Sequence, residues 1–243
     1  MKKILVCGHR GFALKYPQNT LPSFEGAIAA GCDRIEYDLH WTADRRLVVC
    51  HNPTVDSTSN GTGKIAEMTF DEIRKLDFGS WKGEQFAGTP IPEFREVLEL
   101  TNRLNPKLFH LVELKVNSVD YAEHVIRELF RYGMAGRFIL VSFHLDLLRE
   151  VKKLHPEVLV HGNPNTSLKE FDYEDYRIFD WAGIRYDNVT AEIVAGFHSV
   201  GTPVDAWPVD TVEEFRKQAA NGVDSVTSND PETVIAERDR PSN

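Results

Sequence analysis

The chain has 243 residues, of which 42% are hydrophobic and 27% are charged, a composition typical of a globular protein with one large core. Its formal net charge of −9 argues against a nucleic-acid-binding surface, and no run of 18 apolar residues is present to span a membrane. Cys7, Cys32 and Cys50 lie in or beside apolar segments, which predicts buried thiols in a reducing compartment. Only four apolar residues precede Gly8, too few for a signal-peptide core, so the expected location is cytoplasmic.

The chain begins with a strand signal followed by a helix signal. Residues 4–7 are apolar and predict a buried strand that ends at Gly8-His9-Arg10-Gly11. A helix is expected from Thr20, a suitable cap, to Gly31, with Pro22 early in the helix.

A β-hairpin is expected over residues 34–51. Residues 34–40 alternate between apolar and polar side chains, so Glu36 and Asp38 share one face of the first strand. Residues 42–45 provide a polar turn, and 47–49 form a short β-branched run.

A turn between Ala43 and Asp44 would pair Glu36 with His51 and Asp38 with Val49. Two carboxylates and an imidazole on one patch of sheet are costly unless a cation or water satisfies them. The hairpin therefore predicts a hard-metal site with an acid or base beside it.

Residues 52–92 interrupt the alternation of strands and helices. They are rich in Asn, Ser, Thr and Gly, with one short helix expected at 70–76 after the cap Thr69. This segment is predicted to be a small insertion over the barrel mouth described below. Its expected core consists of three aromatic residues, Phe78, Trp81 and Phe86.

The second half of the chain alternates regularly. Strands are expected at 108–115, 137–143, 158–162, 181–186, 203–207 and 223–227. Helices are expected at 92–104, 118–132, 145–154, 167–176, 190–199 and 211–220. With the first arm of the hairpin as a barrel strand, this gives eight βα units. The prediction is one α/β domain over 1–243, a TIM-type (β/α)8 barrel with a small insertion.

Active sites of such barrels lie at the C-terminal ends of the strands. Glu36, Asp38 and Glu113 fall there, and a set of carboxylate oxygens suits Mg²⁺ or Ca²⁺ better than zinc. Arg10 and Lys115 would offset the charge of an anionic substrate.

Several motifs together resemble the glycerophosphodiester phosphodiesterase family. In the first half these are His9-Arg10-Gly11, Pro17-Gln18-Asn19-Thr20, Ile35-Glu36-Tyr37-Asp38, Val48-Val49-Cys50-His51 and Leu76-Asp77-Phe78-Gly79-Ser80-Trp81. In the second half they are Glu113-Leu114-Lys115, Ser142-Phe143, Trp207 and Ser228-Asn229-Asp230-Pro231-Glu232. The resemblance implies a metal-dependent barrel enzyme that hydrolyses glycerophosphodiesters, its small-molecule substrates, to glycerol 3-phosphate and an alcohol.

The resemblance also implies roles for individual residues. The implied set is His9 and His51 as catalytic residues, Glu36, Asp38 and Glu113 as metal ligands, and Arg10 and Lys115 beside the phosphate. Trp207 is either a wall of the substrate pocket or ordinary packing. Two histidines at one mouth predict acid–base exchange through a cyclic phosphate, formed by the glycerol hydroxyl next to the ester. His51 is favoured as the first base because of its expected pairing with Glu36.

Four positions depart from the family pattern. Gln18, Asn52, Ser57 and Asp210 stand where the family usually has glutamate, aspartate, arginine and asparagine. None of these changes removes a metal ligand or a catalytic histidine, so the chemistry is expected to persist. The alcohol is expected to be recognised loosely or unusually.

Two other functions stay open. A metal-assisted lyase or aldolase acting on a phosphorylated substrate would use the same carboxylates and Lys115, but would not need a second histidine. A catalytically silent barrel that binds a phosphate ligand would be favoured if a histidine or metal carboxylate were missing, and none is. His144 and His161 end strands but match no motif. The preferred alcohol, the metal and the oligomeric state, a homo-oligomer included, are left undecided.

Overall fold

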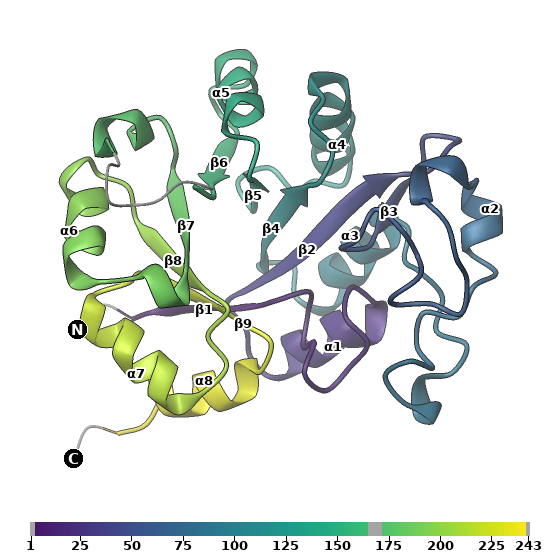
Figure 1. Ribbon diagram of the computed structural model, residues 1–243, viewed down its shortest axis with the longest axis horizontal. Helices are drawn as coiled ribbons and strands as arrows, with labels where there is room; N and C mark the ends of the chain where they lie inside the picture. The colour runs from purple at the N-terminus through teal and green to yellow at the C-terminus, as the bar shows by residue number, and fades with distance from the viewer. Residues whose placement is uncertain (1–2, 165–171, 242–243) are drawn as a thin grey trace.

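The computed structural model describes residues 3–164 and 172–241, and its centre is a closed parallel barrel (Figure 1). The barrel strands are β1 (Leu5–Gly8), β2 (Arg34–Trp41), β4 (Phe109–Leu114), β5 (Phe138–Ser142), β6 (Leu159–Gly162), β7 (Trp181–Arg185), β8 (Val204–Trp207) and β9 (Ser225–Ser228). They are hydrogen-bonded in the order β1-β9-β8-β7-β6-β5-β4-β2, and β1 pairs with β2 to close the ring. The predicted TIM barrel is therefore confirmed. The short strand β3 (Leu47–Val49) lies outside the ring, antiparallel to β2.

Helices surround the barrel. They are α1 (Leu21–Ala29), α3 (Phe94–Leu104), α4 (Val119–Arg131), α5 (Leu145–Leu154), α6 (Ala191–Ser199), α7 (Val212–Asn221) and α8 (Pro231–Arg238). The short helix α2 (Phe70–Ile73) belongs instead to the segment after β3 (Figure 1). Short 3-10 helices occur at η1 (Ile65–Glu67), η2 (Glu84–Phe86), η4 (Tyr173–Tyr176) and η5 (Tyr186–Asn188). The helix expected at 167–176 overlaps η4, while residues 165–171 lie outside the described residues.

Helix α8 was not among the predicted elements. Its local signals are Asp230, whose side chain accepts a hydrogen bond from Thr233 N, and Pro231 in the first turn. Thr20 does precede α1, but its hydroxyl donates to Pro17 O instead of capping the helix.

The interior of the barrel contains an apolar cluster. Its buried residues are Cys7, Leu111, Ile139 and Val141, packed with Phe109, Leu159 and Trp181. The Arg34 guanidinium lies 4.1 Å from the Trp181 ring centroid. Leu111 and Val141 of this cluster also line the cavity described below.

The register of the hairpin differs from the predicted one by one residue. Leu39 pairs with Val49, so Asp38 does not, and His51 lies beyond the end of β3. The turn contains three residues, not two: Thr42 N bonds to Arg46 O at 3.0 Å, and Arg45 adopts φ 60°. Side chains alternate between the two faces of a strand. A shift of one residue in the register therefore brings side chains from the opposite face of one strand beside those of its partner. The predicted pairing of Glu36 with His51 is therefore wrong.

The segment after β3 has its own small core. Its buried residues are Val48, Cys50, Val55, Ile65, Phe70, Ile73, Phe78 and Ile91. Phe78 belongs to this core as expected, but Trp81 is 44% exposed, and the Phe86 ring contacts Tyr16. The expectation of one three-residue aromatic core is thus wrong for Trp81 and Phe86.

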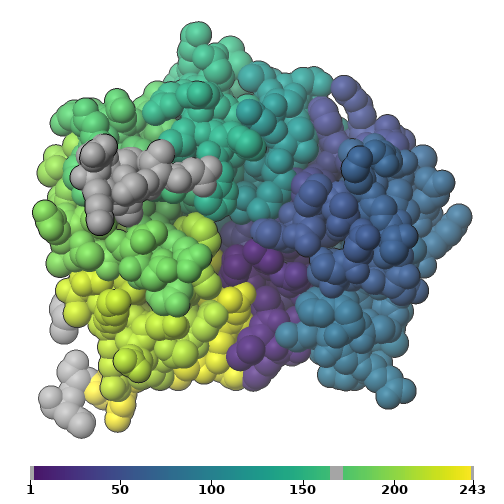
Figure 2. Space-filling model, viewed as in Figure 1, coloured from purple at the N-terminus to yellow at the C-terminus, as the bar shows by residue number. Residues whose placement is uncertain are grey.

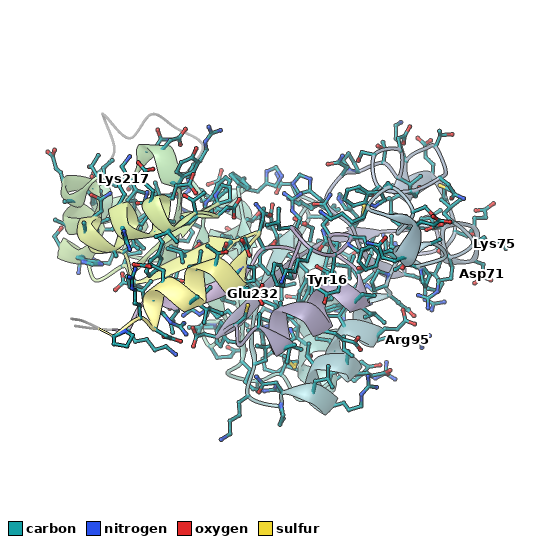
Figure 3. The ribbon with its side chains drawn as sticks, turned by 90° about the horizontal axis from the view of Figure 1, so that it is seen from below. Tyr16, Asp71, Lys75, Arg95, Lys217 and Glu232 are labelled. Carbon is teal, nitrogen blue, oxygen red and sulfur yellow. The ribbon has the colours of Figure 1, made fainter. Side chains whose placement is uncertain are left out.

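The surface carries the charged side chains. Figure 3 shows Asp71, Lys75 and Lys217 at the periphery, all of them exposed. The three cysteines are free and buried, as predicted. Within the described ranges, no helix is long and apolar enough to cross a membrane. Figure 2 shows a hollow near the middle of the face where segments from both halves of the chain meet.

Candidate active site

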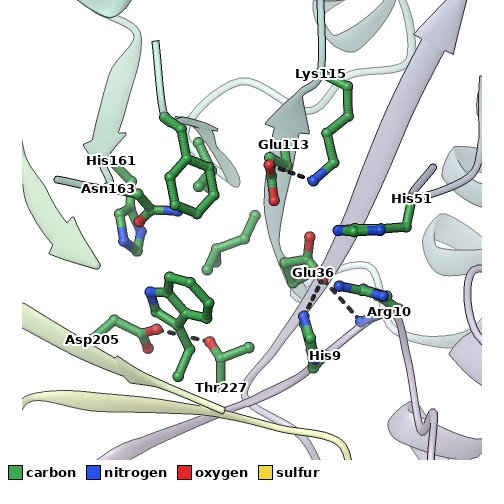
Figure 4. A pocket seen from close by; sticks show the side chains of 14 residues that line it. His9, Arg10, Glu36, His51, Glu113, Lys115, His161, Asn163, Asp205 and Thr227 are labelled. Atoms are coloured by element: carbon green, nitrogen blue, oxygen red, sulfur yellow. Dashed lines mark hydrogen bonds and ion pairs between the residues drawn. The ribbon is translucent and has the colours of Figure 1, made fainter. Parts of the chain in front are cut away.

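A cavity of about 220 Å³ lies at the C-terminal end of the barrel strands (Figure 4). Its lining residues are His9, Arg10, Glu36, His51, Leu111, Glu113, Lys115, Val141, Phe143, His161, Asn163, Asp205, Trp207 and Thr227. Every predicted site residue except Asp38 therefore lines one cavity. Asp38 is fully buried directly behind it.

Three carboxylates converge on one side of the cavity. Ligand oxygens of Glu36, Asp38 and Glu113 all lie within 4.8 Å of one another. Glu36 and Asp38 share the inward face of β2, and Asp38 is the register neighbour of Glu113 on β4. Asn19 orients the cluster by donating its side-chain N–H to Asp38 Oδ2 at 2.7 Å.

Arg10 and Lys115, which were expected beside the phosphate, also contact the carboxylates of this cluster. Lys115 Nζ is 2.9 Å from Asp38 Oδ1 and 2.5 Å from Glu113 Oε1. Arg10 Nε is 3.5 Å from Asp38 Oδ2. Burial opposes ionisation of Asp38, but the Lys115 and Arg10 charges hold its pKa well below the usual range.

The other two carboxylates lack sufficient positive charge. Burial and the Asp38 charge raise the pKa of Glu113 to about 7 and the pKa of Glu36 well above its usual value. Glu36 Oε1 is buried without a hydrogen-bond partner in the described part of the chain. A hard divalent cation would satisfy this oxygen and favour the ionised carboxylates, so the three residues fit Mg²⁺ or Ca²⁺.

His9 is held by a chain of two hydrogen bonds. Its Nδ1 lies 2.8 Å from Asn229 Oδ1, and Asn229 Nδ2 donates to Asp210 Oδ2 at 2.8 Å. Because the Asp210 carboxylate only accepts, it determines the amide orientation of Asn229, and His9 Nδ1 must carry the proton. His9 Nε2 then presents its lone pair, 4.0 Å from Glu36 Oε2. Burial lowers the pKa of His9 to about 3, so this imidazole is neutral.

His51 lies in a similar but less buried setting. Its Nδ1 is 2.7 Å from Asn52 Oδ1, and Asn52 Nδ2 donates to Ser57 Oγ at 2.8 Å. The His51 carbonyl lies 3.2 Å from His40 Nε2. Burial lowers the pKa of His51.

The four departures from the family pattern contact site residues but do not line the cavity. Gln18 Oε1 accepts a hydrogen bond from Arg10 Nη1 at 2.6 Å. Asn52 and Ser57 support His51, and Asp210 supports His9 through Asn229. These residues therefore contact the catalytic groups from outside the cavity.

The far side of the cavity contains residues that no motif indicated. They are His161, Asn163, Asp205 and Thr227. Phe143, from the Ser142-Phe143 motif, lines the same side. The Trp207 indole lies there as well, edge-to-face with Phe143 at 5.6 Å, which favours the pocket-wall interpretation over simple packing. The alternation of side chains along β6 and β8 is the sequence pattern that could have identified the inward-facing His161 and Asp205. His144, the other strand-end histidine, is exposed.

Comparisons with known proteins agree over nearly the whole chain. Residues 9–233 match the model of the glycerophosphoryl diester phosphodiesterase family. A glycerophosphodiester phosphodiesterase of Caldanaerobacter subterraneus is 36% identical over 242 residues, covering 96% of this chain and 97% of that protein. A putative glycerophosphodiester phosphodiesterase of Bacillus subtilis is 30% identical, covering 95% and 96%.

Solved structures show the same fold. A putative glycerophosphoryl diester phosphodiesterase from Silicibacter pomeroyi superposes with a TM-score of 0.87 at 26% identity, covering 98% of this chain and 93% of that one. A phosphodiesterase from Oleispira antarctica, solved with the product sn-glycerol-3-phosphate, gives a TM-score of 0.86 at 23% identity, with 97% of each chain covered.

Proposed function

This chain belongs to the glycerophosphoryl diester phosphodiesterase family of phosphoric diester hydrolases, and from that premise we propose that it cleaves glycerophosphodiesters to glycerol 3-phosphate and an alcohol. The observation that carries the proposal is the meeting of two histidines and three carboxylates at one cavity. A metal-assisted lyase or aldolase would not need the second histidine. A catalytically silent barrel that binds a phosphate ligand would not need to retain both histidines.

Glu36, Asp38 and Glu113 would hold the divalent cation, Mg²⁺ or Ca²⁺. When bound, the cation supplies charge neutralisation at a phosphate oxygen and lowers the pKa of the attacking hydroxyl. Arg10 and Lys115 would neutralise the remaining phosphate charge.

The glycerol hydroxyl adjacent to the ester is the proposed nucleophile, because it is tethered to the phosphorus and needs no free water. Its oxygen bonds to phosphorus as the bond to the alcohol oxygen breaks. The first base is His9, whose Nε2 lone pair is exposed by the hydrogen bond at Nδ1. His51, the less buried imidazole, protonates the leaving oxygen. Water then opens the cyclic phosphate with the two roles reversed.

The sequence favoured His51 as the first base because it was expected to pair with Glu36. The observed register of β2 and β3 does not form that pair. His9, not His51, is the histidine beside that carboxylate. The assignment thus follows from the observed hydrogen bonds instead of the predicted hairpin register.

The leaving alcohol would project from the cavity mouth. A second hollow of about 280 Å³ is lined by Ala13, Leu14, Gln18, Trp81, Lys82, Asp210 and Asn229. Gln18 bonds to Arg10 and Asn229 to His9, so this hollow adjoins the catalytic residues. Lys82 Nζ donates to Ala13 O at 2.8 Å, which supports the interpretation of the 52–92 insertion as a wall of the mouth. An open, mixed surface of this kind fits alcohols of several sizes.

The proposal is tested by incubating the protein with glycerophosphocholine in Mg²⁺ or Ca²⁺ and measuring release of glycerol 3-phosphate. Excess EDTA should abolish turnover, and either ion should restore it. A diester without the hydroxyl next to the ester should bind but turn over poorly. Full turnover in EDTA would disprove the metal requirement, and rapid cleavage of that analogue would disprove the internal attack.

A further inference from the structure

The two catalytic histidines reach the cavity from different elements and are anchored in different ways (Figure 4). His9 follows β1, and its main-chain N–H donates to Ser228 O at 2.8 Å. Its ring is held by Asn229, and that chain of hydrogen bonds ends at the Asp210 carboxylate. Ser228 and Asn229 lie at the end of β9, which is hydrogen-bonded to β1, so the barrel itself fixes this imidazole.

The ring of His51 is held by its own segment. Its Nδ1 partner, Asn52, is the next residue, and Asn52 bonds in turn to Ser57. All three residues follow β3, so these two bonds fix the ring relative to the segment and not relative to the barrel. They end on a hydroxyl, and hydrogen bonds between neutral groups are roughly half as strong as those of ionised groups.

Two hydrogen bonds join residues 50 and 51 to β2. Cys50 N donates to Asp38 O at 3.0 Å. The side chain of His40 reaches the main-chain carbonyl of His51, with its Nε2 3.2 Å from the oxygen. Because a carbonyl oxygen only accepts, His40 Nε2 carries the proton of this bond. The neutral ring with its proton at Nε2 and the imidazolium both donate here, so the bond does not depend on the charge of His40.

The position of His40 suits this contact. His40 lies on β2 opposite Val48 of β3, and it is 7% exposed. Strand alternation places it on the same face of β2 as Glu36 and Asp38. The described lining of the cavity does not include His40, so its contribution to the reaction is indirect.

One strand thereby carries two parts of the proposed catalytic apparatus. Glu36 and Asp38 would hold the cation, and His40 holds the carbonyl of the residue proposed as the acid. A strand positions side chains more precisely than a loop does. Proton transfer needs heavy-atom distances of about 2.6–3.2 Å, and a displacement of about 1 Å can lower the rate by about 10²-fold.

We infer that His40 is a positioning residue for the reaction: by holding the His51 carbonyl, it keeps the proposed acid at a fixed distance from the metal carboxylates of the same strand. This inference rests on the proposed function. Without the donor, the carbonyl must find another partner, and the shift that brings it there displaces the imidazole.

The first test compares three substitutions of His40 in the turnover of glycerophosphocholine with Mg²⁺ or Ca²⁺ present. In His40→Gln, the amide N–H lies about as far from the main chain as Nε2 of histidine and can donate to the same carbonyl. In His40→Asn the amide is one methylene shorter, and in His40→Leu the side chain has no donor. We expect kcat to fall about tenfold or more in His40→Asn and His40→Leu, with little change in KM, and to stay within about threefold of the wild type in His40→Gln.

His124→Leu is the matched control. It removes a histidine hydrogen bond to Trp41, the residue after His40, outside the cavity, and should leave kcat unchanged. A merely structural role of His40 would change the free energy of unfolding without this pattern in kcat. An equal kcat in all three His40 variants, normal or reduced, would overturn the inference. If His40→Leu fails to fold, the comparison of His40→Gln with His40→Asn decides.

The second test does not depend on turnover. The ¹H–¹³C signal of the His51 ring, assigned by its absence in His51→Ala, should shift and broaden in His40→Leu and His40→Asn. It should stay at the wild-type position in His40→Gln. A chain that hydrolyses no glycerophosphodiester would disprove the proposed function, and this arm would still decide whether His40 positions His51. A ring signal that is unchanged in all three variants would overturn the inference.

Discussion

The two sides of the cavity differ in how their polar groups are satisfied. We call them the catalytic wall (His9, Arg10, Glu36, His51, Glu113 and Lys115) and the polar wall (His161, Asn163, Asp205 and Trp207). On the catalytic wall, Lys115 and Arg10 contact the carboxylates, and both histidines have hydrogen-bond partners at Nδ1. On the polar wall, neutral groups such as the His161 ring stay unpaired. Buried charges are costly without counter-charges, and here Lys115 and Arg10 balance them in part, whereas unpaired neutral donors and acceptors cost less. Substitutions in the catalytic wall should therefore lower kcat, and substitutions in the polar wall should raise KM.

The largest effect is expected when a metal carboxylate is neutralised. Glu113→Gln should lower kcat by about 10²-fold or more and reduce bound metal, because an uncharged amide is a weaker ligand for a hard cation. Activity and elemental analysis of the purified variant measure both. Glu99→Gln, at an exposed helical position, should change neither. Normal metal content with normal kcat would show that Glu113 is not a ligand.

Removal of either catalytic imidazole should come next. His9→Ala and His51→Ala should each lower kcat by about 10²-fold or more with little change in KM, since each histidine moves a proton in the transition state. His155→Ala, at a surface ion pair with Glu123, serves as the control. The proposed exchange of acid and base roles fails if only one of the two substitutions affects kcat.

Acid should destabilise the protein partly through the polar wall. The pKa of His161 is about 3 in the folded state and about 6.5 in an unfolded chain. The unfolded chain thus binds more protons, so this contribution is complete above about pH 6.5 and is lost as the pH falls towards 3. Between about pH 6 and 4, the free energy of unfolding should depend less steeply on pH in His161→Phe than in the wild type. The difference in slope should be about 1.4 kcal/mol per pH unit.

Denaturant unfolding at several pH values measures this slope. Asn163→Leu alters the same wall without removing a titrating group and should keep the wild-type slope. An identical slope in His161→Phe would mean that the folded protein accommodates the charged imidazole.

The smallest effect concerns the support of the catalytic wall from behind. Asp210→Asn places an amide N–H against Asn229 Nδ2, so two donors face each other. A flip of the Asn229 amide removes this conflict but turns its N–H towards His9 Nδ1. His9 Nδ1 must then accept, and the His9 proton moves to Nε2. We expect about a tenfold lower kcat with unchanged KM, and a changed tautomer in the ¹⁵N spectrum of His9. The Asp210→Asn/Asn229→Asp double variant restores an acceptor for His9 Nδ1 and should recover activity. A merely structural role would show no change in tautomer and no rescue.

The sequence by itself determined most of the barrel and of the catalytic wall. Strict alternation in residues 34–40 is a local property of an extended chain, so it placed Glu36 and Asp38 on one face without tertiary information. The C-terminal ends of all barrel strands lie at one end of the barrel. This rule predicted that Glu113 and His9 would lie near Glu36, and all three line the same cavity.

Only the tertiary structure decided the hairpin register and the polar wall. The register depends on the left-handed conformation of Arg45, which nothing in its side chain requires. The polar wall joins residues from strands more than forty positions apart, and the space for them exists because Gly183 has no side chain. Local patterns report the periodicity of one strand, whereas the ladder register and the contacts across the barrel depend on all the strands that close it.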